Sequence, residues 1–271
     1  ALHGSDIEPS RPDMHLAYNQ NFPWYYGTDG NPSNAQYDLV SVVMHEIAHG
    51  LGFSGSMRWD DGVYNPAQGN PQECDGVAGH GCWGGGTGMP IVYDRFVEDG
   101  GGNALTNTAT YPNPSSALGT TLTGDNIWFD GSHANAANGG NRVKLYAPAT
   151  WQSGSSYAHL DESFNGTQNA LMTYSLDYGE ANHNPGPIAL GVLQDVGWTT
   201  NSAPPSTGQD IIRNGGFDYD KAGWITNPFG THVGDGFGKN GIGYGMQIWP
   251  EYSNNRGYIG QELYLPTQTT A

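Results

Sequence analysis

Two histidines and a glutamate stand together in one short segment of the chain. His45 and His49 are four residues apart, and Glu46 directly follows the first of them. On an α-helix this spacing stacks the two imidazoles on one face, because 3.6 residues make a turn. Two neutral imidazoles on one face can bind a single zinc ion at about 2.0–2.1 Å. The glutamate would then point toward a water at the ion, so the segment predicts hydrolysis of peptide bonds.

The residues around this motif have the pattern of a buried helix. Asp38 is suited to cap its first turn, and Gly50 or Gly52 to end it. Apolar residues fill most of the positions between these signals: Leu39, Val40, Val42, Val43, Ile47, Ala48 and Leu51. Purely structural histidines on so apolar a helix would bury polar rings without partners, which costs free energy. A zinc site is therefore favoured over a chance match of the motif.

The composition limits the classes of partner. The chain has 271 residues, enough for a catalytic core and a smaller module, and its 9 Lys+Arg against 26 Asp+Glu give a net charge of −17. This charge argues against nucleic acid and anionic membrane surfaces as partners. With 42 Gly and 17 Pro we expect a loop-rich fold, and because no run of 18 apolar residues occurs we expect no membrane span. A secreted protein fits these features, and its Asp-Gly and Asp-Asn pairs are candidates for holding structural calcium, Ca²⁺.

Two cysteines, Cys74 and Cys82, lie eight residues apart in a glycine-rich segment. A metal-binding pair is disfavoured, because such pairs have closer spacing and further ligands nearby. The spacing favours a disulfide that closes a loop, and a disulfide favours an oxidising, extracellular compartment.

A catalytic zinc needs a third protein ligand and one open position. Many metzincin proteases place a third histidine six residues after the second, just past a glycine. Here that position is Gly55, and the short pattern fails. Glu73 lies among turn-forming residues rather than on a helix, which argues against it. His159 has the best surroundings among the remaining histidines, and His183 is its rival in a turn-rich segment.

Several spaced segments together resemble leishmanolysin-type metzincins and their secreted bacterial relatives. They are Gly52-Phe53 after the zinc helix, the distant His159, the turn Leu171-Met172, and the proline-started closing helix Pro187–Trp198. The resemblance covers Asp38–Phe53 and Ser155–Trp198. It implies that His159 is the third zinc ligand and that Met172 is the methionine-turn residue beneath the metal.

Tyr174 stands two residues after Met172. In astacin-like and serralysin-like metzincins a tyrosine at that offset approaches the metal. The similarity makes Tyr174 a candidate donor to a developing oxyanion, while packing in the core is an equally open role for it.

We expect an α+β fold in three parts, of which the metzincin resemblance implies the first. Residues 1–198 form a metzincin-like catalytic domain with a large loop-rich insertion at about 54–154, and residues 199–208 have the composition of a linker. Residues 209–271 are similar to the opening of carbohydrate-binding jelly-roll modules and form a partial β-sandwich. We expect short strands near these positions: 13–19, 91–96, 142–146, 246–249 and 258–265. Trp224, Trp249 and Tyr252 are candidates for stacking on a glycan.

These observations predict a secreted zinc metalloendopeptidase that acts on protein or peptide substrates. Glu46 takes a proton from the attacking water and later delivers it to the leaving amine. The alternatives are a glycan-binding adhesin with a structural zinc site, and part of a larger polymer-degrading enzyme. A fourth protein ligand would favour a structural site, whereas an open position would oppose it.

Overall fold

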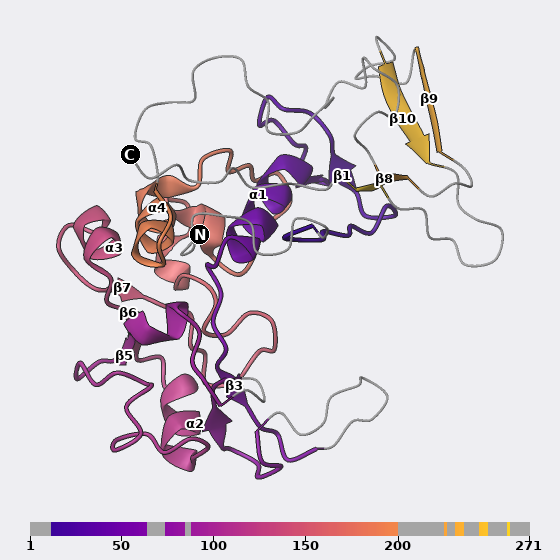
Figure 1. Cartoon of the computed structure of the whole chain (residues 1–271). Coiled ribbons are helices and arrows are strands. Elements are labelled where there is room, and N and C mark those ends of the chain that lie inside the picture. The colour runs from indigo at the N-terminus through magenta and orange to yellow at the C-terminus, as the bar shows by residue number, and fades with distance from the viewer. Residues whose placement is uncertain are drawn as a thin grey trace. The chain divides into compact units, whose positions relative to one another are not determined.

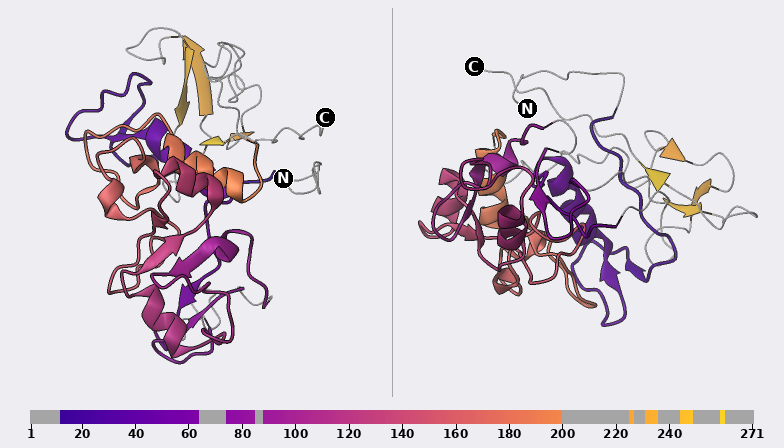
Figure 2. Two further views of the ribbon diagram at one scale, coloured as in Figure 1. Left: turned by 90° about the vertical axis from the view of Figure 1, so that its left-hand side faces the viewer. Right: turned by 90° about the horizontal axis from the view of Figure 1, so that it is seen from below.

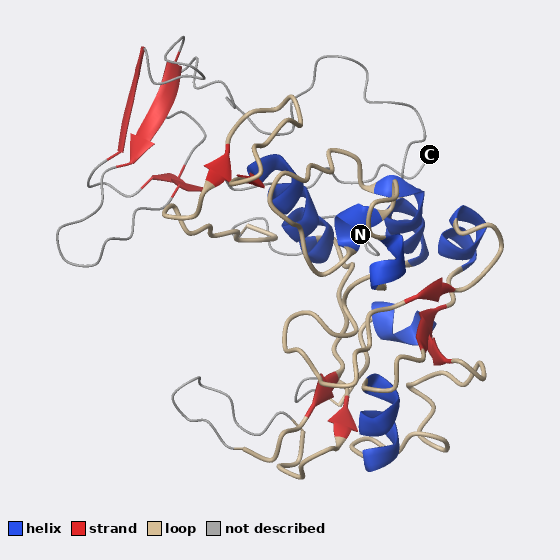
Figure 3. Cartoon of the chain, turned by 180° about the vertical axis from the view of Figure 1, so that it is seen from behind, coloured by secondary structure: helices blue, strands red, loops and turns tan. Residues whose placement is uncertain are grey.

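The computed structural model describes residues 12–63, 74–84 and 88–199, together with the backbone of four short strands farther along the chain (Figure 1). The chain divides into two compact units. The first comprises Ala1–Val42, Asp177–Ala181 and Asn201–Ala271, and the second comprises Val43–Leu176 and Asn182–Thr200. Short helices and small sheets are joined by extensive loops (Figure 3), so at this level the fold is α+β.

Two very short strands lie in the first unit ahead of the helix. β1 (Trp24–Tyr25) runs parallel to β2 (Tyr37–Asp38). The expected strand at 13–19 is wrong, because residues 12–19 form neither helix nor strand. A turn follows at Asn19, whose carbonyl accepts the backbone N–H of Phe22 and the indole N–H of Trp24.

The four C-terminal strands form two antiparallel pairs. β8 (Ile225–Thr226) pairs with β11 (Ile259–Gly260), and β9 (Thr231–Asp235) pairs with β10 (Tyr244–Ile248). The strands expected at 246–249 and 258–265 overlap β10 and β11. A jelly-roll module stays a prediction, and the 199–208 linker lies outside the described residues except for Thr199.

The helix predicted around His45 and His49 is confirmed as α1 (Leu39–Gly50). Asp38 caps it, because its buried carboxylate accepts the backbone N–H of Ser41 at 2.8 Å. At the other end Gly52 adopts φ +110°, and the N–H of Phe53 reaches back to the Ala48 carbonyl at 3.0 Å. This six-to-one bond with a left-handed glycine is a Schellman-type stop, as the sequence indicates.

The 54–154 region begins with a small hairpin. β3 (Arg58–Trp59) pairs antiparallel with β4 (Gly81–Cys82), and the expected disulfide joins Cys74 to Cys82. Asp60 pins the loop between these strands, because its carboxylate accepts four backbone N–H groups. The sequence predicts the disulfide but not this carboxylate clip.

A three-stranded antiparallel sheet follows, in the order β5-β6-β7. Its strands are β5 (Val97–Asp99), β6 (Ile127–Phe129) and β7 (Val143–Lys144). β7 lies inside the strand expected at 142–146. The strand expected at 91–96 is wrong: the carboxylate of Asp94 accepts the N–H of Ile91 at 2.9 Å, and a 3₁₀ turn, η2 (Tyr93–Phe96), forms there instead.

Helices and turns complete the second unit around one apolar core. They are α2 (Ser116–Leu122), α3 (Ser132–Ala137), η3 (Glu162–Phe164), η4 (Ala170–Met172) and α4 (Gly186–Asp195). α3 and α4 lie side by side (Figure 2), with Gly191 at the contact, where a Cβ would come within 2.7 Å of Ala134. The closing helix is as predicted: Pro187 lies in its first turn, and Gly197 ends it at φ +113°.

α1 and the closing helix α4 are joined in the core. The indole N–H of Trp198, after α4, donates to the Leu51 carbonyl at the end of α1, at 2.6 Å. Phe53 and Met172 are completely buried in the same cluster. The described residues include no helix with the length and apolar character needed to cross a membrane.

Candidate metal centre

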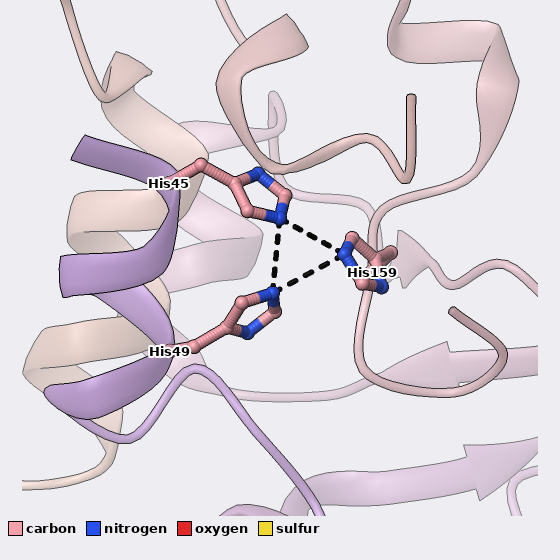
Figure 4. A group of neighbouring side chains, drawn as sticks. All are labelled: His45, His49 and His159. Atoms are coloured by element: carbon pink, nitrogen blue, oxygen red, sulfur yellow. Dashed lines mark hydrogen bonds between the residues drawn. The ribbon is translucent and has the colours of Figure 1, made fainter. Parts of the chain in front are cut away.

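Three imidazole nitrogens converge in the second unit (Figure 4). The Nε2 atom of His45 lies 3.0 Å from Nε2 of His49 and 3.0 Å from Nε2 of His159, and the remaining Nε2–Nε2 distance is 3.2 Å. His45 and His49 project from α1, and His159 faces them from a separate segment. Among the residues the structure describes, this trio is the one group of His, Cys, Asp or Glu side chains placed to hold a metal ion.

Each histidine uses its other ring nitrogen to bind a backbone carbonyl. The three Nδ1 atoms each lie 2.7 Å from a carbonyl oxygen, in the pairs His45–Leu171, His49–Phe53 and His159–Ser155. A carbonyl oxygen only accepts, so each Nδ1 carries the hydrogen. In a neutral ring Nε2 then holds a lone pair. Three lone pairs therefore point at one another.

The charge state of the trio agrees with this arrangement. Burial lowers the pKa of His45, and the nearby Glu46 carboxylate partly opposes that shift. Burial, followed by the proximity of His49 and His45, lowers the pKa of His159 to about 3. These two rings are thus uncharged at neutral pH, as metal ligands must be.

The trio passes a simple test of fit to zinc. Two ligands on a tetrahedral zinc, each about 2.0–2.1 Å from the ion, lie about 3.3 Å apart, and the nitrogens here are 3.0–3.2 Å apart. Three acceptors that face each other with no donor between them are unfavourable, and a cation resolves this. Histidine ligands oriented by carbonyl partners are also the usual arrangement around zinc.

The stop signal of α1 orients the second ligand. Gly52 in its left-handed conformation turns the chain back, so that Phe53 caps the helix through its N–H. The carbonyl of the same Phe53 accepts the Nδ1 hydrogen of His49. One turn thus ends the helix and fixes the imidazole.

The first candidate ligand, His45, is oriented by the turn that contains Met172. The backbone carbonyl that accepts from His45 belongs to Leu171, in η4. Met172 is completely buried beside it, and its own carbonyl accepts the N–H of Leu160 at 2.8 Å. The turn therefore joins the first ligand to the segment of the third.

The third ligand lies in a short ladder of extended chain. Leu160 bridges Leu145 on one side and Thr173 on the other. The His159 carbonyl accepts the backbone N–H of Tyr146 at 2.9 Å, and the imidazole itself is only 4% exposed. Position 159 is therefore fixed by the backbone on both sides.

The two predicted catalytic side chains, Glu46 and Tyr174, lie in different surroundings. Glu46 is half-buried on α1, directly after His45, and its charge acts on that ring. Tyr174 is 36% exposed, which argues against a core role, and it stacks on Tyr146 with ring centroids 4.3 Å apart. Burial raises the pKa of Tyr146 to about 12, and a hydrogen bond with Tyr174 adds to the shift.

The rival ligand His183 and the buried carboxylate of Asp60 both lie outside the trio. The rival ligand His183 is exposed and is not part of the group. Asp60 already accepts four N–H groups, which occupies a carboxylate that could otherwise bind calcium. Calcium stays a prediction, as does stacking of Trp224, Trp249 and Tyr252 on a glycan, because these three residues lie outside the described residues.

Sequence reasoning missed the groups that orient the ligands. The carbonyls of Phe53, Ser155 and Leu171 carry no signal in residue type, because every residue has one. Gly52 is the exception, since a glycine just past a helix indicates the turn that positions the Phe53 carbonyl.

Comparison with known proteins gives one partial match. A family model described as SPBPB7E8-like matches residues 7–73, a segment that includes α1 with its two ligands but stops before His159. No curated protein and no solved structure matches the chain. The function therefore has to be inferred from the site itself.

Proposed function

We propose that this protein is a secreted zinc-dependent endopeptidase with a metzincin-like catalytic domain. The observation that carries the proposal is the convergence of three Nε2 lone pairs, two of them from a helix that also bears Glu46. Three protein ligands are what a catalytic zinc uses, whereas structural sites use four. No fourth ligand side chain joins the group within the described ranges.

The protein's own residues have separate tasks in this reaction. His45, His49 and His159 hold the metal, and their carbonyl partners keep each Nε2 directed at it. Zinc, when bound, supplies a Lewis acid that polarises a carbonyl and lowers the pKa of water.

Glu46 is the proposed general base. It accepts a proton from the water that attacks the scissile carbonyl carbon, and it returns that proton to the amine as the C–N bond breaks. Tyr174 is the proposed donor to the oxyanion, and its ring stacks on that of Tyr146.

Secretion is supported by the disulfide between Cys74 and Cys82, since such bonds persist in oxidising compartments. The net charge of −17 opposes binding to nucleic acid. A glycan-binding adhesin with a structural zinc is the second candidate, and the three-ligand group argues against its closed site.

Glu46→Gln tests the proposed reaction. The neutral amide leaves the three ligands in place but cannot take up a proton, so we expect one zinc per chain and casein cleavage reduced by about 10²–10⁴-fold. Metal analysis gives the first quantity, and a chelator-sensitive cleavage assay gives the second. Parental cleavage by the variant would sink the mechanism, and zinc without cleavage in the parent protein would favour the adhesin.

A further inference from the structure

A buried carboxylate outside the metal centre joins two of the segments that build it. Asp94, in η2, is completely buried. Its Oδ1 accepts the backbone N–H of Ser56 and the hydroxyl of Tyr157, each at 2.9 Å. Its Oδ2 accepts the hydroxyl of Ser56 and the N–H of Ile91. Both oxygens are thus occupied by neutral donors.

The partners of Asp94 stand next to the ligands in sequence. Ser56 comes three residues after Phe53, whose carbonyl orients His49. Tyr157 comes two residues before His159. One carboxylate therefore ties the chain that leaves α1 to the chain that presents the third ligand.

Gly55 allows these segments to meet. A Cβ at this position would overlap the ring of Tyr157 and lie 2.9 Å from Oδ1 of Asp94. This is the position where the short metzincin pattern places its third histidine. Glycine at position 55 thus supplies no nearby third ligand, and its lack of a side chain leaves room for the segment that carries His159.

Tyr157 adopts a conformation that depends on its surroundings. Its φ is +74°, which is unfavourable for a residue with a side chain. Its hydroxyl binds Asp94, its N–H donates to the Tyr146 carbonyl at 2.8 Å, and its ring is 1% exposed. Such strain persists only where neighbouring contacts hold it, and here the hydroxyl bond is one of those contacts.

We infer that Asp94 is a positioning residue of the metal centre, which acts through Tyr157 and Ser56 to hold His159 against the end of α1. The inference rests on the metal site of the proposed function but not on peptide cleavage. Asp94 touches none of the ligands, and its effect is on their spacing.

Tyr157→Phe is the sharpest test, because it removes the hydroxyl and keeps the ring. Groups that bind a metal ligand directly are worth about 10–100-fold in metal affinity, and because Tyr157 acts one contact farther out we expect the zinc affinity to fall by about tenfold, the lower end of that range. Zinc affinity is measured by competition with a chromophoric chelator. Co²⁺ serves as a second probe, and its visible absorption should change as the coordination geometry loosens.

Tyr111→Phe is the matched control. Tyr111 is also a buried tyrosine, 7% exposed, and donates to a carboxylate, that of Asp99 on β5. We expect Tyr111→Phe to leave the zinc affinity and the Co²⁺ spectrum unchanged. Equal weakening in both variants would mean general destabilisation and would overturn the inference, as would Tyr157→Phe with zinc affinity within twofold of the parent.

Ser56→Ala tests the other end of the bridge and decides the question if Tyr157→Phe does not fold. It removes the hydroxyl that binds Oδ2 of Asp94. Weaker zinc binding with an unchanged circular dichroism spectrum supports the positioning role, and unchanged zinc binding refutes it. These experiments measure zinc affinity and not peptide cleavage. A parent protein that binds zinc but cleaves no peptide would therefore refute the proposed function and leave the positioning role of Asp94 standing.

Discussion

Replacement of His159 by alanine tests the assembly of the whole site. The imidazole is the one ligand that α1 does not supply, and its Nε2 lies 3.0–3.2 Å from the other two. Protein zinc sites of four ligands bind with about 10–16 kcal/mol, or about 2.5–4 kcal/mol per ligand. Each 1.4 kcal/mol is tenfold in affinity, so we expect His159→Ala to weaken zinc by about 10²–10³-fold.

The assay for His159→Ala is titration against a chelator of known affinity, with the cleavage rate measured at saturating and limiting zinc. His183→Ala is the matched control, because His183 is exposed and outside the trio. We expect the control to bind zinc as the parent does. If His159→Ala kept zinc within twofold of the parent and cleaved at the same rate, the three-ligand site would have to be abandoned, although α1 would stand.

Three further outcomes follow from particular contacts. Tyr174→Phe should keep zinc and lower the cleavage rate by up to about 10²-fold, the lower end for one oxyanion donor, and an unchanged rate would remove this residue from the mechanism. Gly52→Ala, at φ +110°, should destabilise the fold by about 1–3 kcal/mol and weaken zinc binding, because it misplaces His49. Gly140→Ala, at φ +85°, should lower the stability but leave zinc binding unchanged. Thermal melts measure the first effect and zinc titration the second. Burial raises the pKa of Asp99, but hydrogen bonds from Tyr111 and Asn103 outweigh it and lower that pKa to about 2. The contribution of Asp99 to stability is therefore present above about pH 4 and is lost as the pH falls toward 2. Melting temperatures across this pH range should decline in the parent protein and decline less in Asp99→Asn.

The parts of the site that local sequence determines were predictable. α1 has its cap at Asp38, ahead of the motif, and its left-handed stop at Gly52, just after it, and both signals act within a few residues. α4 likewise has Pro187 in its first turn and Gly197 at its end. Such elements form from short-range geometry, so the sequence alone indicates them.

The parts that depend on distant contacts were not predictable. The segment 91–96 has apolar residues typical of a strand, but it forms η2, in which the Asp94 carboxylate is held by the distant Ser56 and Tyr157. The stretch 13–19 pairs with no strand among the described residues and stays irregular. Pairing decides whether extended chain becomes a strand, and single-sequence patterns do not contain the partner.

The third candidate ligand comes from a segment far along the chain from α1, so a long intervening segment must begin and end beside the site. His49 and His159 are 110 residues apart. Loop-closure entropy grows only with the logarithm of length, about 0.6 kcal/mol for each doubling, so the length between them costs little. What must be kept is the junction where the segment between these two histidines begins and ends. Gly55 and Ser56 lie at the start of this segment, and Tyr157 lies at its end. The Asp94 carboxylate binds Ser56 at one end and Tyr157 at the other. The metal centre therefore depends more on this junction than on the loops between, and substitutions in those loops should alter the walls of the site before they alter its ligands.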